Sequence, residues 1–390
     1  MARLSDICLK IGSGATPTGG KSAYLMKGIS LIRSQNVLDI SFAEDGLAYI
    51  SDEQARKLQN VEILEGDILL NITGDSVARV CIVPNHILPA RVNQHVAIIR
   101  VDKTKADNNY ILYSLIKSKK TLLALASAGS TRNALTKKMI EEFEVFLPSL
   151  AEQKRIASIL SSLDDKIAVN RRINANLEAQ AQALFKSWFV DFTPFKDQPF
   201  VDSELGPIPQ GWKVGTLFDV ANLHDRYRRP LSSNQRSLMA KKYPYYGATS
   251  LMDFVEDYIF DGEYVLMGED GSVVTEKGYP FIQYVWGKIW VNNHAHVLSG
   301  KDGFPTELLI PFLKTYNIKG LVTGAVQAKL NQANMAQIQI PIPPKKNINN
   351  LSVIIKSIYK KYRLLTEENQ RLAALRDTLL PKLMSGEIKL

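Results

Sequence analysis

The second half of this 390-residue chain repeats its first half at an offset of about 195 residues. Leu135 matches Leu330 and Pro148 matches Pro343, and a long heptad pattern of apolar residues follows each proline. A repeat of this length indicates a duplicated domain, because the units of solenoid proteins span only about 20–50 residues. We therefore predict two similar domains, each followed by a long helix.

Each domain has the sequence pattern of mixed α and β structure. Residues 69–72 and 96–99 are short apolar runs typical of strands, and residues 110–125 have helical spacing. Residues 143–147 alternate as a half-buried strand does. The predicted fold class is α+β, and the predicted segments are domain 1 (1–148), helical spacer 1 (149–193), domain 2 (194–343) and helical spacer 2 (344–390).

The two helices carry apolar stripes that step by alternating spacings of four and three residues. One stripe runs from Ile156 to Trp188 and the other from Leu351 to Leu383. Such a stripe needs a partner helix to bury it. Because compact domains usually have neighbouring termini, we expect the second helix to fold back along the first. The prediction is a long antiparallel two-helix coiled coil with pseudo-twofold symmetry.

Three asparagines, Asn170, Asn174 and Asn369, interrupt the middle of these apolar stripes. A polar residue at a seam position lowers stability but specifies register. Our hypothesis is that they set the register of the coiled coil and hence the distance between the domains. The alternative is that they are solvated or water-bridged side chains without such a role.

The chain is basic, with a formal net charge of +9 and a pI of about 9.2. A polyanionic partner is one explanation, and an ordinarily basic cytosolic protein is another. Because Cys8 and Cys81 are the two cysteines, we expect a reducing compartment and no disulfide framework. The N-terminus lacks an apolar signal region and no segment approaches about 18 uninterrupted apolar residues, so we expect a cytoplasmic protein without membrane contact.

Four segments of the chain resemble the specificity (S) subunit of type I restriction-modification enzymes. They occur in the order and at the spacing of that family, and the resemblance covers essentially the whole chain. One departure is that the second helix begins after Pro343-Pro344-Lys345-Lys346, whereas a Pro-x-x-Glu-Gln sequence begins the first. The four segments are Leu147–Ile156, Ala181–Phe192, Ile208–Trp212 and Leu375–Ile388.

The resemblance implies a subunit without chemistry of its own. Each target-recognition domain would bind one half of a bipartite, interrupted site on double-stranded DNA, and diverged loops imply an asymmetric site. The helices would dock two methyltransferase (M) subunits, and restriction/translocase (R) subunits would complete the complex. S-adenosylmethionine, ATP and magnesium would belong to those partners, and no cofactor to this chain. The alternatives are a coiled-coil protein-interaction scaffold without DNA specificity and a self-sufficient modification enzyme.

Motifs for catalysis or metal binding are weak in this sequence. Gly19–Ser22 resembles the end of a phosphate-binding loop, but Ala15 stands where such a loop requires glycine. His294 and His296 have no third histidine or cysteine within ligand spacing. We therefore predict no catalytic residue and no metal site.

Candidate DNA contacts are polar side chains on repeat-equivalent loops, because Arg, Asn and Gln carry the paired donors and acceptors that read base edges. Clustered arginines around Tyr227 suit phosphate contacts instead. The alternative for each residue is an ordinary solvated loop side chain. The candidates for base reading are Arg33, Gln35, Asn36, Thr73, Asp75, Arg79, Thr131, Arg132 and Asn133 in domain 1, and Tyr246, Thr249, Glu269, Ser272, Gln327 and Lys329 in domain 2. The candidates for phosphate contact are Arg226, Arg228 and Arg229.

Two aromatic residues beside the first apolar stripe, Phe185 and Phe189, are candidates for docking a partner subunit. The alternative is that they pack the coiled coil against the recognition domains.

Overall fold

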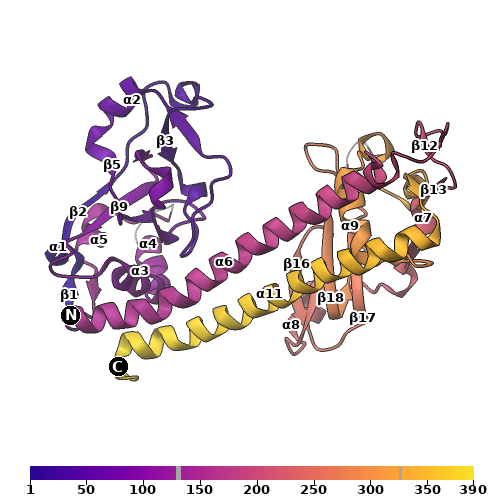
Figure 1. Cartoon of the computed structure of the whole chain (residues 1–390). Coiled ribbons are helices and arrows are strands. Elements are labelled where there is room, and N and C mark those ends of the chain that lie inside the picture. Colours follow the sequence, from indigo (N-terminus) through magenta and orange to yellow (C-terminus); the bar gives the residue numbers. More distant parts are fainter. Residues whose placement is uncertain (129–132, 325–326) are drawn as a thin grey trace. The chain divides into compact units, whose positions relative to one another are not determined.

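The computed structural model describes residues 1–128, 133–324 and 327–390 (Figure 1). The chain forms two compact units. The first unit comprises Met1–Val169 and Glu368–Leu390, and the second comprises Asn170–Glu367. Each unit therefore contains one of the two predicted domains together with part of both long helices.

The first unit contains two four-stranded sheets and a short strand pair. In the first sheet all neighbours are antiparallel, whereas β3 and β8 of the second sheet are parallel. The first sheet consists, in spatial order, of β2 (Cys8–Ser13), β9 (Val96–Val101), β6 (Ile68–Asn71) and β7 (Val80–Ile82). The second consists of β4 (Ala48–Ile50), β3 (Ile29–Ile32), β8 (Ala90–Val92) and β5 (Glu62–Ile63), and β1 (Ala2–Arg3) pairs with β10 (Glu144–Val145).

Strands β6 and β9 confirm the two strands predicted from apolar runs. Their side chains alternate between two cores: Ile68 and Leu70 belong to one core, and Leu69 belongs to the other. Both faces of the strand are buried, which explains why the run is continuously apolar rather than alternating. The first core lies against the helices of the unit, and the second lies against the second sheet.

The helical pattern of residues 110–125 is divided between two helices. One helix, α3, is buried on most faces, whereas α4 buries only Leu122 and Ala126, so a break at Ser118 lets the two helices orient independently. The predicted strand at 143–147 is shorter than expected and forms β10. The helices of this unit are α1 (Leu4–Ile7), α2 (Asp52–Lys57), α3 (Asn108–Lys117), α4 (Lys119–Ser127) and α5 (Lys137–Glu141).

The second unit is built on a six-stranded sheet. All neighbours in it are antiparallel except β15 and β18. Its strands, in spatial order, are β14 (Ala221–Leu223), β19 (Ala295–Gly300), β17 (Phe260–Gly268), β18 (Ile282–Val291), β15 (Tyr243–Tyr246) and β16 (Leu251–Val255). The remaining elements are the pairs β11 (Phe200–Val201) with β12 (Ile208–Pro209) and β13 (Lys213–Thr216) with β20 (Gln339–Ile342), and the helices α7 (Leu217–Val220), α8 (Ser233–Ser237), α9 (Thr306–Thr315) and α10 (Gln332–Met335).

Both units contain the same turn, in which an asparagine side chain bonds the backbone of a histidine two residues later. The side-chain oxygen of Asn93 accepts a hydrogen bond from the backbone N–H of His95 at 3.1 Å. The side-chain oxygen of Asn292 accepts the same bond from His294 at 2.8 Å. Both asparagines are buried, so each turn is fixed from inside its domain. The predicted duplication is therefore present in three dimensions as well as in sequence.

The two long helices, α6 (Leu150–Phe189) and α11 (Lys345–Ser385), pass through both units. In the first unit Leu160 of α6 shares a core with Leu383 of α11. In the second unit Phe185 of α6 shares a core with Leu351 of α11. The start of one helix thus packs beside the end of the other, and in each unit they run antiparallel, as predicted (Figure 1). Within the described residues, no helix is long and apolar enough to span a membrane.

Candidate nucleic-acid interface

Three loops predicted to contact DNA meet at the end of strand β6 in the first unit. The side-chain amide of Asn71 donates to the carbonyl of Ser34 at 2.8 Å, and its backbone N–H donates to the carbonyl of Arg79 at 2.9 Å. The next residue, Ile72, accepts the backbone N–H of Leu135 at 2.8 Å. These hydrogen bonds tie all three loops to the end of β6, which acts as their common support. We call residues 33–36, 73–79 and 133–135 the first loop cluster.

 

Hydrogen bonds, and not closeness in the sequence, hold the loops of the first cluster together. Ser34, Ile72 and Leu135 are far apart in the sequence, and the backbone bridge between Thr73 and Ala134 adds a further link between two of the loops. A strand end buried on both faces is a rigid base for loops of this kind. The polar side chains that the sequence singled out are thereby collected in one place.

The side chains of the first loop cluster differ in how accessible they are. Gln35, Asp75 and Asn133 are exposed, and Arg33, Thr73 and Arg79 are half-buried. The hydroxyl oxygen of Thr73 lies 2.7 Å from Nδ1 of His95, so the shared turn also orients this side chain. The other two candidates for base reading in this domain, Thr131 and Arg132, lie outside the described residues.

The prediction that Asn36 reads a base is wrong, because its side chain is fully buried. Its amide nitrogen donates to the carbonyl of Ala43 at 2.9 Å, and its oxygen accepts the backbone N–H of Arg33 at 3.0 Å. These bonds use the donor and the acceptor that adenine would require. Asn36 instead shapes the loop that carries Arg33 and Gln35.

The second unit repeats this arrangement at the end of β17. Glu269 accepts the backbone N–H of Leu330 at 2.8 Å, as Ile72 accepts that of Leu135 in the first unit. The N–H of Gly271 donates to the carbonyl of Ala328 at 2.9 Å. We call residues 226–229, 245–249, 269–272 and 327–330 the second loop cluster.

The loop at 245–249 joins the second cluster through the shared turn. The backbone N–H of Asn292 donates to the carbonyl of Tyr246 at 3.1 Å. Thr249, like the other candidates Ser272, Gln327 and Lys329, is exposed. Tyr246 is half-buried, and burial raises the pKa of its hydroxyl. Base contact by these residues stays a prediction.

The three arginines predicted to bind phosphate divide into two kinds. Arg226 and Arg229 are exposed, and the Arg226 guanidinium lies 4.6 Å from the centre of the Tyr227 ring. The carbonyl of Arg229 accepts the indole N–H of Trp290 at 2.7 Å, which holds the loop while leaving the side chain outside. These two residues have the exposure that a phosphate contact requires.

Arg228 does not fit a phosphate contact, because its side chain is only 11% exposed. Its guanidinium lies 2.6 Å from the carboxylate of Glu269 and 3.2 Å from that of Asp225. Glu269 is likewise engaged and only 16% exposed, so the prediction that it reads a base is also wrong. Arg228 and Glu269 bind each other inside the domain.

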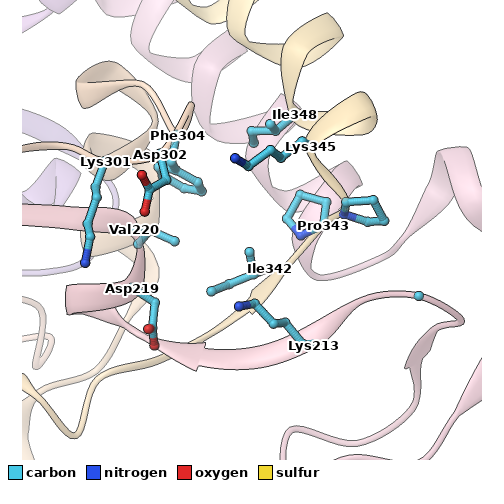
Figure 2. Close-up of a pocket in the computed structure, with 12 residues that line it drawn as sticks. Lys213, Asp219, Val220, Lys301, Asp302, Phe304, Ile342, Pro343, Lys345 and Ile348 are labelled. Carbon is cyan, nitrogen blue, oxygen red and sulfur yellow. The ribbon is translucent and has the colours of Figure 1, made fainter.

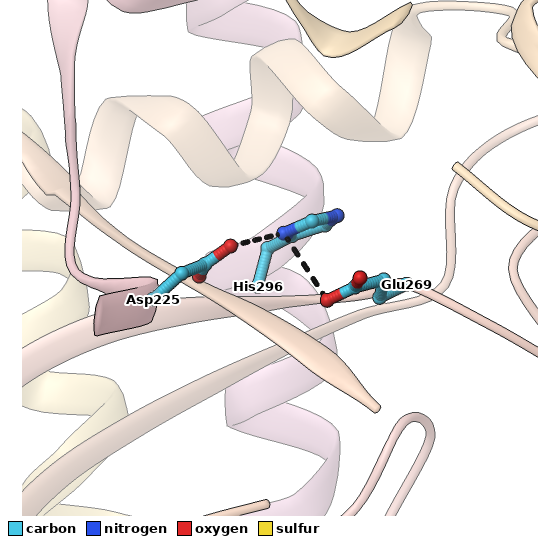
Figure 3. Close-up of side chains that lie close together, drawn as sticks. All are labelled: Asp225, Glu269 and His296. Atoms are coloured by element: carbon cyan, nitrogen blue, oxygen red, sulfur yellow. Dashed lines mark hydrogen bonds and ion pairs between the residues drawn. The ribbon is translucent and has the colours of Figure 1, made fainter. Parts of the chain in front are cut away.

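Asp225 and Glu269 also surround His296, and Figure 3 shows the three side chains pointing toward one another. Their ligand atoms all lie within 4.8 Å, which is close enough for a metal site. The Arg228 guanidinium already neutralises both carboxylates, and both ring nitrogens of His296 face protein acceptors. The cluster therefore does not fit a metal ion.

The charge state of Asp225 follows from its partners. Burial alone would raise its pKa, but hydrogen bonds from His296 and from the backbone of Val297, together with the charge of Arg228, lower it. The Asp225 carboxylate is ionised, so within this cluster it forms an ion pair with the Arg228 guanidinium.

A sequence model of the type I restriction modification DNA specificity domain matches residues 2–179 and 209–374. These two segments cover most of both units, including the strand ends that support the two loop clusters. The chain belongs to the type I restriction-modification specificity (S) subunits. The resemblance drawn from the sequence is confirmed.

Relatives of this S subunit are named as type I restriction enzyme specificity subunits. The MjaIX specificity subunit of Methanocaldococcus jannaschii is 26% identical over 411 residues, which are 97% of this chain and 91% of that protein. A chain from Haemophilus influenzae named for the same role is 39% identical over 148 residues, which are 38% of this chain and 37% of that protein.

A solved structure supports the fold. The S subunit of a type I restriction-modification system from M. genitalium aligns with 98% of this chain and 95% of its own, with a TM-score of 0.60. The sequence identity is only 16%, so the likeness concerns the fold. The α+β architecture with two recognition domains is thus shared with another S subunit.

The helices of this S subunit correct one prediction about partner docking. Phe185 and Phe189 are 3% and 4% exposed, and their rings stack at 4.7 Å. Phe189 also packs edge-on against Trp212 at 5.6 Å. The two phenylalanines therefore belong to the core of the second domain and offer no surface to a partner, as the alternative interpretation expected.

The seam asparagine Asn174 has an interhelical partner inside the second unit. Its amide donates to the hydroxyl of Thr366 at 2.9 Å and to the carbonyl of Tyr362 at 3.3 Å. Asn170 is buried and Asn369 is half-buried. A role of the three residues in register stays a hypothesis.

Ionic contacts that join the helices to the domains were not predicted. In the second unit Arg363 of α11 lies 2.8 Å from the carboxylate of Glu263. In the first unit Arg376 of α11 lies 2.6 Å from that of Asp164 of α6, which also accepts the hydroxyl of Tyr113 at 2.6 Å. Arg376 stands in the apolar stripe, which is a signal that sequence reasoning could have used.

A separate cavity of about 430 Å³ lies where β13 and β20 meet the start of α11. Figure 2 shows three lysines around it, Lys213, Lys301 and Lys345. Lys301 donates to the carbonyl of Phe218 at 2.8 Å, and the nearby Asp219 accepts the backbone N–H of Thr216 at 2.7 Å. The cavity shares no residue with the second loop cluster.

Proposed function

We propose that this S subunit is the non-catalytic DNA-recognition subunit of a type I restriction-modification complex and that it reads an asymmetric, bipartite site. Each domain would read one half-site with its loop cluster. The observation that carries the proposal is that two loop clusters stand on equivalent strand ends and present different polar side chains.

The asymmetry of the site is argued from equivalent positions in the two clusters. Thr73 and Asp270 follow equivalent residues at the two strand ends, and each side chain lies beside the histidine of the shared turn. A hydroxyl can donate or accept a hydrogen bond, whereas a carboxylate only accepts. Two clusters with the same support and different donors should therefore prefer different bases.

The rival proposal is a coiled-coil scaffold whose domains bind protein. The exposed arginines Arg226 and Arg229 favour a polyanion over a protein surface, in line with the net charge of +9. A measured preference for one bipartite duplex would exclude the scaffold.

The partners proposed for the helices are two M subunits, with R subunits completing the complex. Exposed apolar side chains lie on both helices and support a docking role: Val169, Ile173, Leu364 and Leu375. Under this proposal S-adenosylmethionine, ATP and magnesium bind the partner subunits.

The test is to co-express the chain with its neighbouring methyltransferase and map modified adenines across the genome. The expected result is an interrupted motif with one methyladenine per half-site on opposite strands. A continuous palindrome would contradict the proposal, and so would methyl transfer by the purified chain alone.

A further inference from the structure

A buried ionic network lies at the base of the second loop cluster and includes two residues of that cluster, Arg228 and Glu269. It consists of Asp225, Arg228, Glu269 and His296, whose side chains are 6%, 11%, 16% and 1% exposed. Asp225 and Arg228 follow β14, Glu269 follows β17, and His296 lies in β19. The network therefore joins three neighbouring strands at the edge where their loops begin.

Both ring nitrogens of His296 lie beside oxygen atoms that accept hydrogen bonds. Its Nε2 lies 2.7 Å from the carbonyl oxygen of Leu330, which can only accept, so Nε2 carries a proton. Its Nδ1 lies 2.5 Å from the carboxylate of Asp225 and 3.7 Å from that of Glu269. The His296 ring and the Arg228 guanidinium thus lie beside the same two carboxylates, those of Asp225 and Glu269.

The network also binds the backbone of the loops above it. The Arg228 guanidinium donates to the carbonyl of Ala295 at 2.8 Å and to that of Asn293 at 3.3 Å. The amide of Gln332 donates to Asp225 at 3.1 Å. With the bond from His296 to Leu330, these contacts fix the segment that follows Lys329 and the residues on either side of His294 in the shared turn.

The first domain has an apolar core at the equivalent positions. In the strand pairing Leu70 lies opposite Ala97, and Met267 lies opposite His296. Ile72 likewise takes the place of Glu269, and both Ile72 and Ala97 are buried. The backbone framework is the same in both domains, but an apolar core supports one loop cluster and an ionic network supports the other.

We propose that Arg228, Asp225, Glu269 and His296 are positioning residues that determine the specificity of the second domain by holding its loops in place. The inference rests on the proposed function, because it assumes that this cluster reads a half-site. A buried ionic network makes loop geometry sensitive to single substitutions, since removing one partner leaves another charge unpaired. The planar guanidinium makes Arg228 the member that lysine cannot replace.

The test uses the complex of the full S subunit with its methyltransferase subunits. Arg228→Lys and Arg228→Met are compared with wild type on duplexes that carry single base changes in one half-site or the other. Both variants are expected to lose discrimination at the second half-site by roughly tenfold and to keep it at the first. The first domain is thus an internal control for folding and assembly.

A second readout separates positioning from phosphate contact. The salt dependence of binding should be unchanged in Arg228→Lys, because this side chain would neutralise no phosphate. Unchanged discrimination at the second half-site in both Arg228 variants would overturn the inference. So would a loss of affinity on all sequences with a reduced salt slope.

A double-mutant cycle tests whether the residues act as one network. Arg228→Met and Glu269→Met each leave a buried charge, whereas the double variant removes the pair. Its loss of discrimination should be smaller than the product of the two single losses, and a multiplicative loss would contradict the network. Failure of the proposed function would look different, because wild type would then discriminate at neither half-site.

Discussion

At the residue scale, exposure separates side chains that can touch DNA from those that support them. Arg226, Arg228 and Arg229 are indistinguishable as a sequence cluster, yet only the first and last are exposed. Arg228 instead forms ion pairs with the buried carboxylates of Asp225 and Glu269. The same reasoning removes Asn36 from the set of base-reading candidates and leaves its exposed neighbour Gln35.

The double variant Arg226→Gln, Arg229→Gln should weaken binding on all sequences. If each arginine neutralises one phosphate, the slope of log K against log salt falls in magnitude by about 1.8. Discrimination between bases should persist, because phosphate contacts carry no sequence information directly. Titrations at several salt concentrations check this, and an unaltered slope would assign both residues to ordinary solvated loops.

A buried carboxyl predicts how the stability of the second unit depends on pH. Burial raises the pKa of Glu307, and the neighbouring Glu263 raises it further, although Arg363 opposes the shift. The folded state therefore holds the proton more tightly than the unfolded chain, so this group stabilises the fold most at low pH. This contribution is lost as the pH rises from the pKa of the carboxyl group in the unfolded chain through its raised pKa in the folded state.

Wild type should thus lose stability relative to Glu307→Gln as the pH rises. All four tryptophans lie in the second unit, so tryptophan fluorescence during denaturant unfolding reports that unit. Glu256→Gln, which removes an exposed carboxylate, is the matched control. Parallel curves for wild type and Glu307→Gln would contradict the argument.

At the element scale, the long helices are parts of both domain cores as well as partners of each other. Phe185 and Phe189 fill the core of the second domain, and Leu160 with Leu383 completes that of the first. Ion pairs also orient helix α11 against its neighbours, through Arg363 in one unit and Arg376 in the other. A substitution in a helix is therefore expected to affect the domain on which it packs.

Arg376→Ala should loosen the packing of α3 against the helices in the first unit. It leaves Asp164, only 14% exposed, with the hydroxyl of Tyr113 and without its cation. The expected cost is about 3 kcal/mol, the lower end for a broken buried pair. Thiol labelling of the buried Cys81, resolved by peptide mass spectrometry, should accelerate, and an unchanged labelling rate would refute the prediction.

The register hypothesis makes a separate prediction. Replacing Asn174 and Asn369 by leucine removes the bond between Asn174 and Thr366 and the polar constraint on the seam. If these residues set the helix register, the number of base pairs between the half-sites should change. Mapping modified adenines with the variant measures that spacing, and the wild-type spacing would count against the hypothesis.

At the scale of the whole molecule, the duplication predicts modular recognition. Each unit has its own core and its own loop cluster, and the two share equivalent hydrogen bonds around His95 and His294. In the described residues, the hydrogen bonds that support each cluster come from that cluster's own unit.

A hybrid that carries residues 1–148 of another S subunit should recognise a new first half-site and the original second one. Methylation mapping of the hybrid, in complex with its methyltransferase, checks this prediction. A change in both half-sites would show that the domains do not read independently.

Much of the architecture follows from the sequence because it depends on periodic patterns. The heptad patterns predict two helices whose apolar stripes are buried against each other, and the apolar runs at 69–72 and 96–99 predict buried strands. The break at Ser118 and the short β10 were not predicted, because tertiary packing decides where a helix or strand ends.

The sequence by itself determined the duplication, the antiparallel helix pair and the membership of the S-subunit family, since each is recorded in long, regular patterns. Only the tertiary structure decided which polar residues face outward and which are buried. Arg228 and Glu269 are 41 residues apart, so no local pattern could indicate their ion pair. Burial and pairing depend on contacts between distant segments, and those contacts exist only once the strands of the sheet have come together.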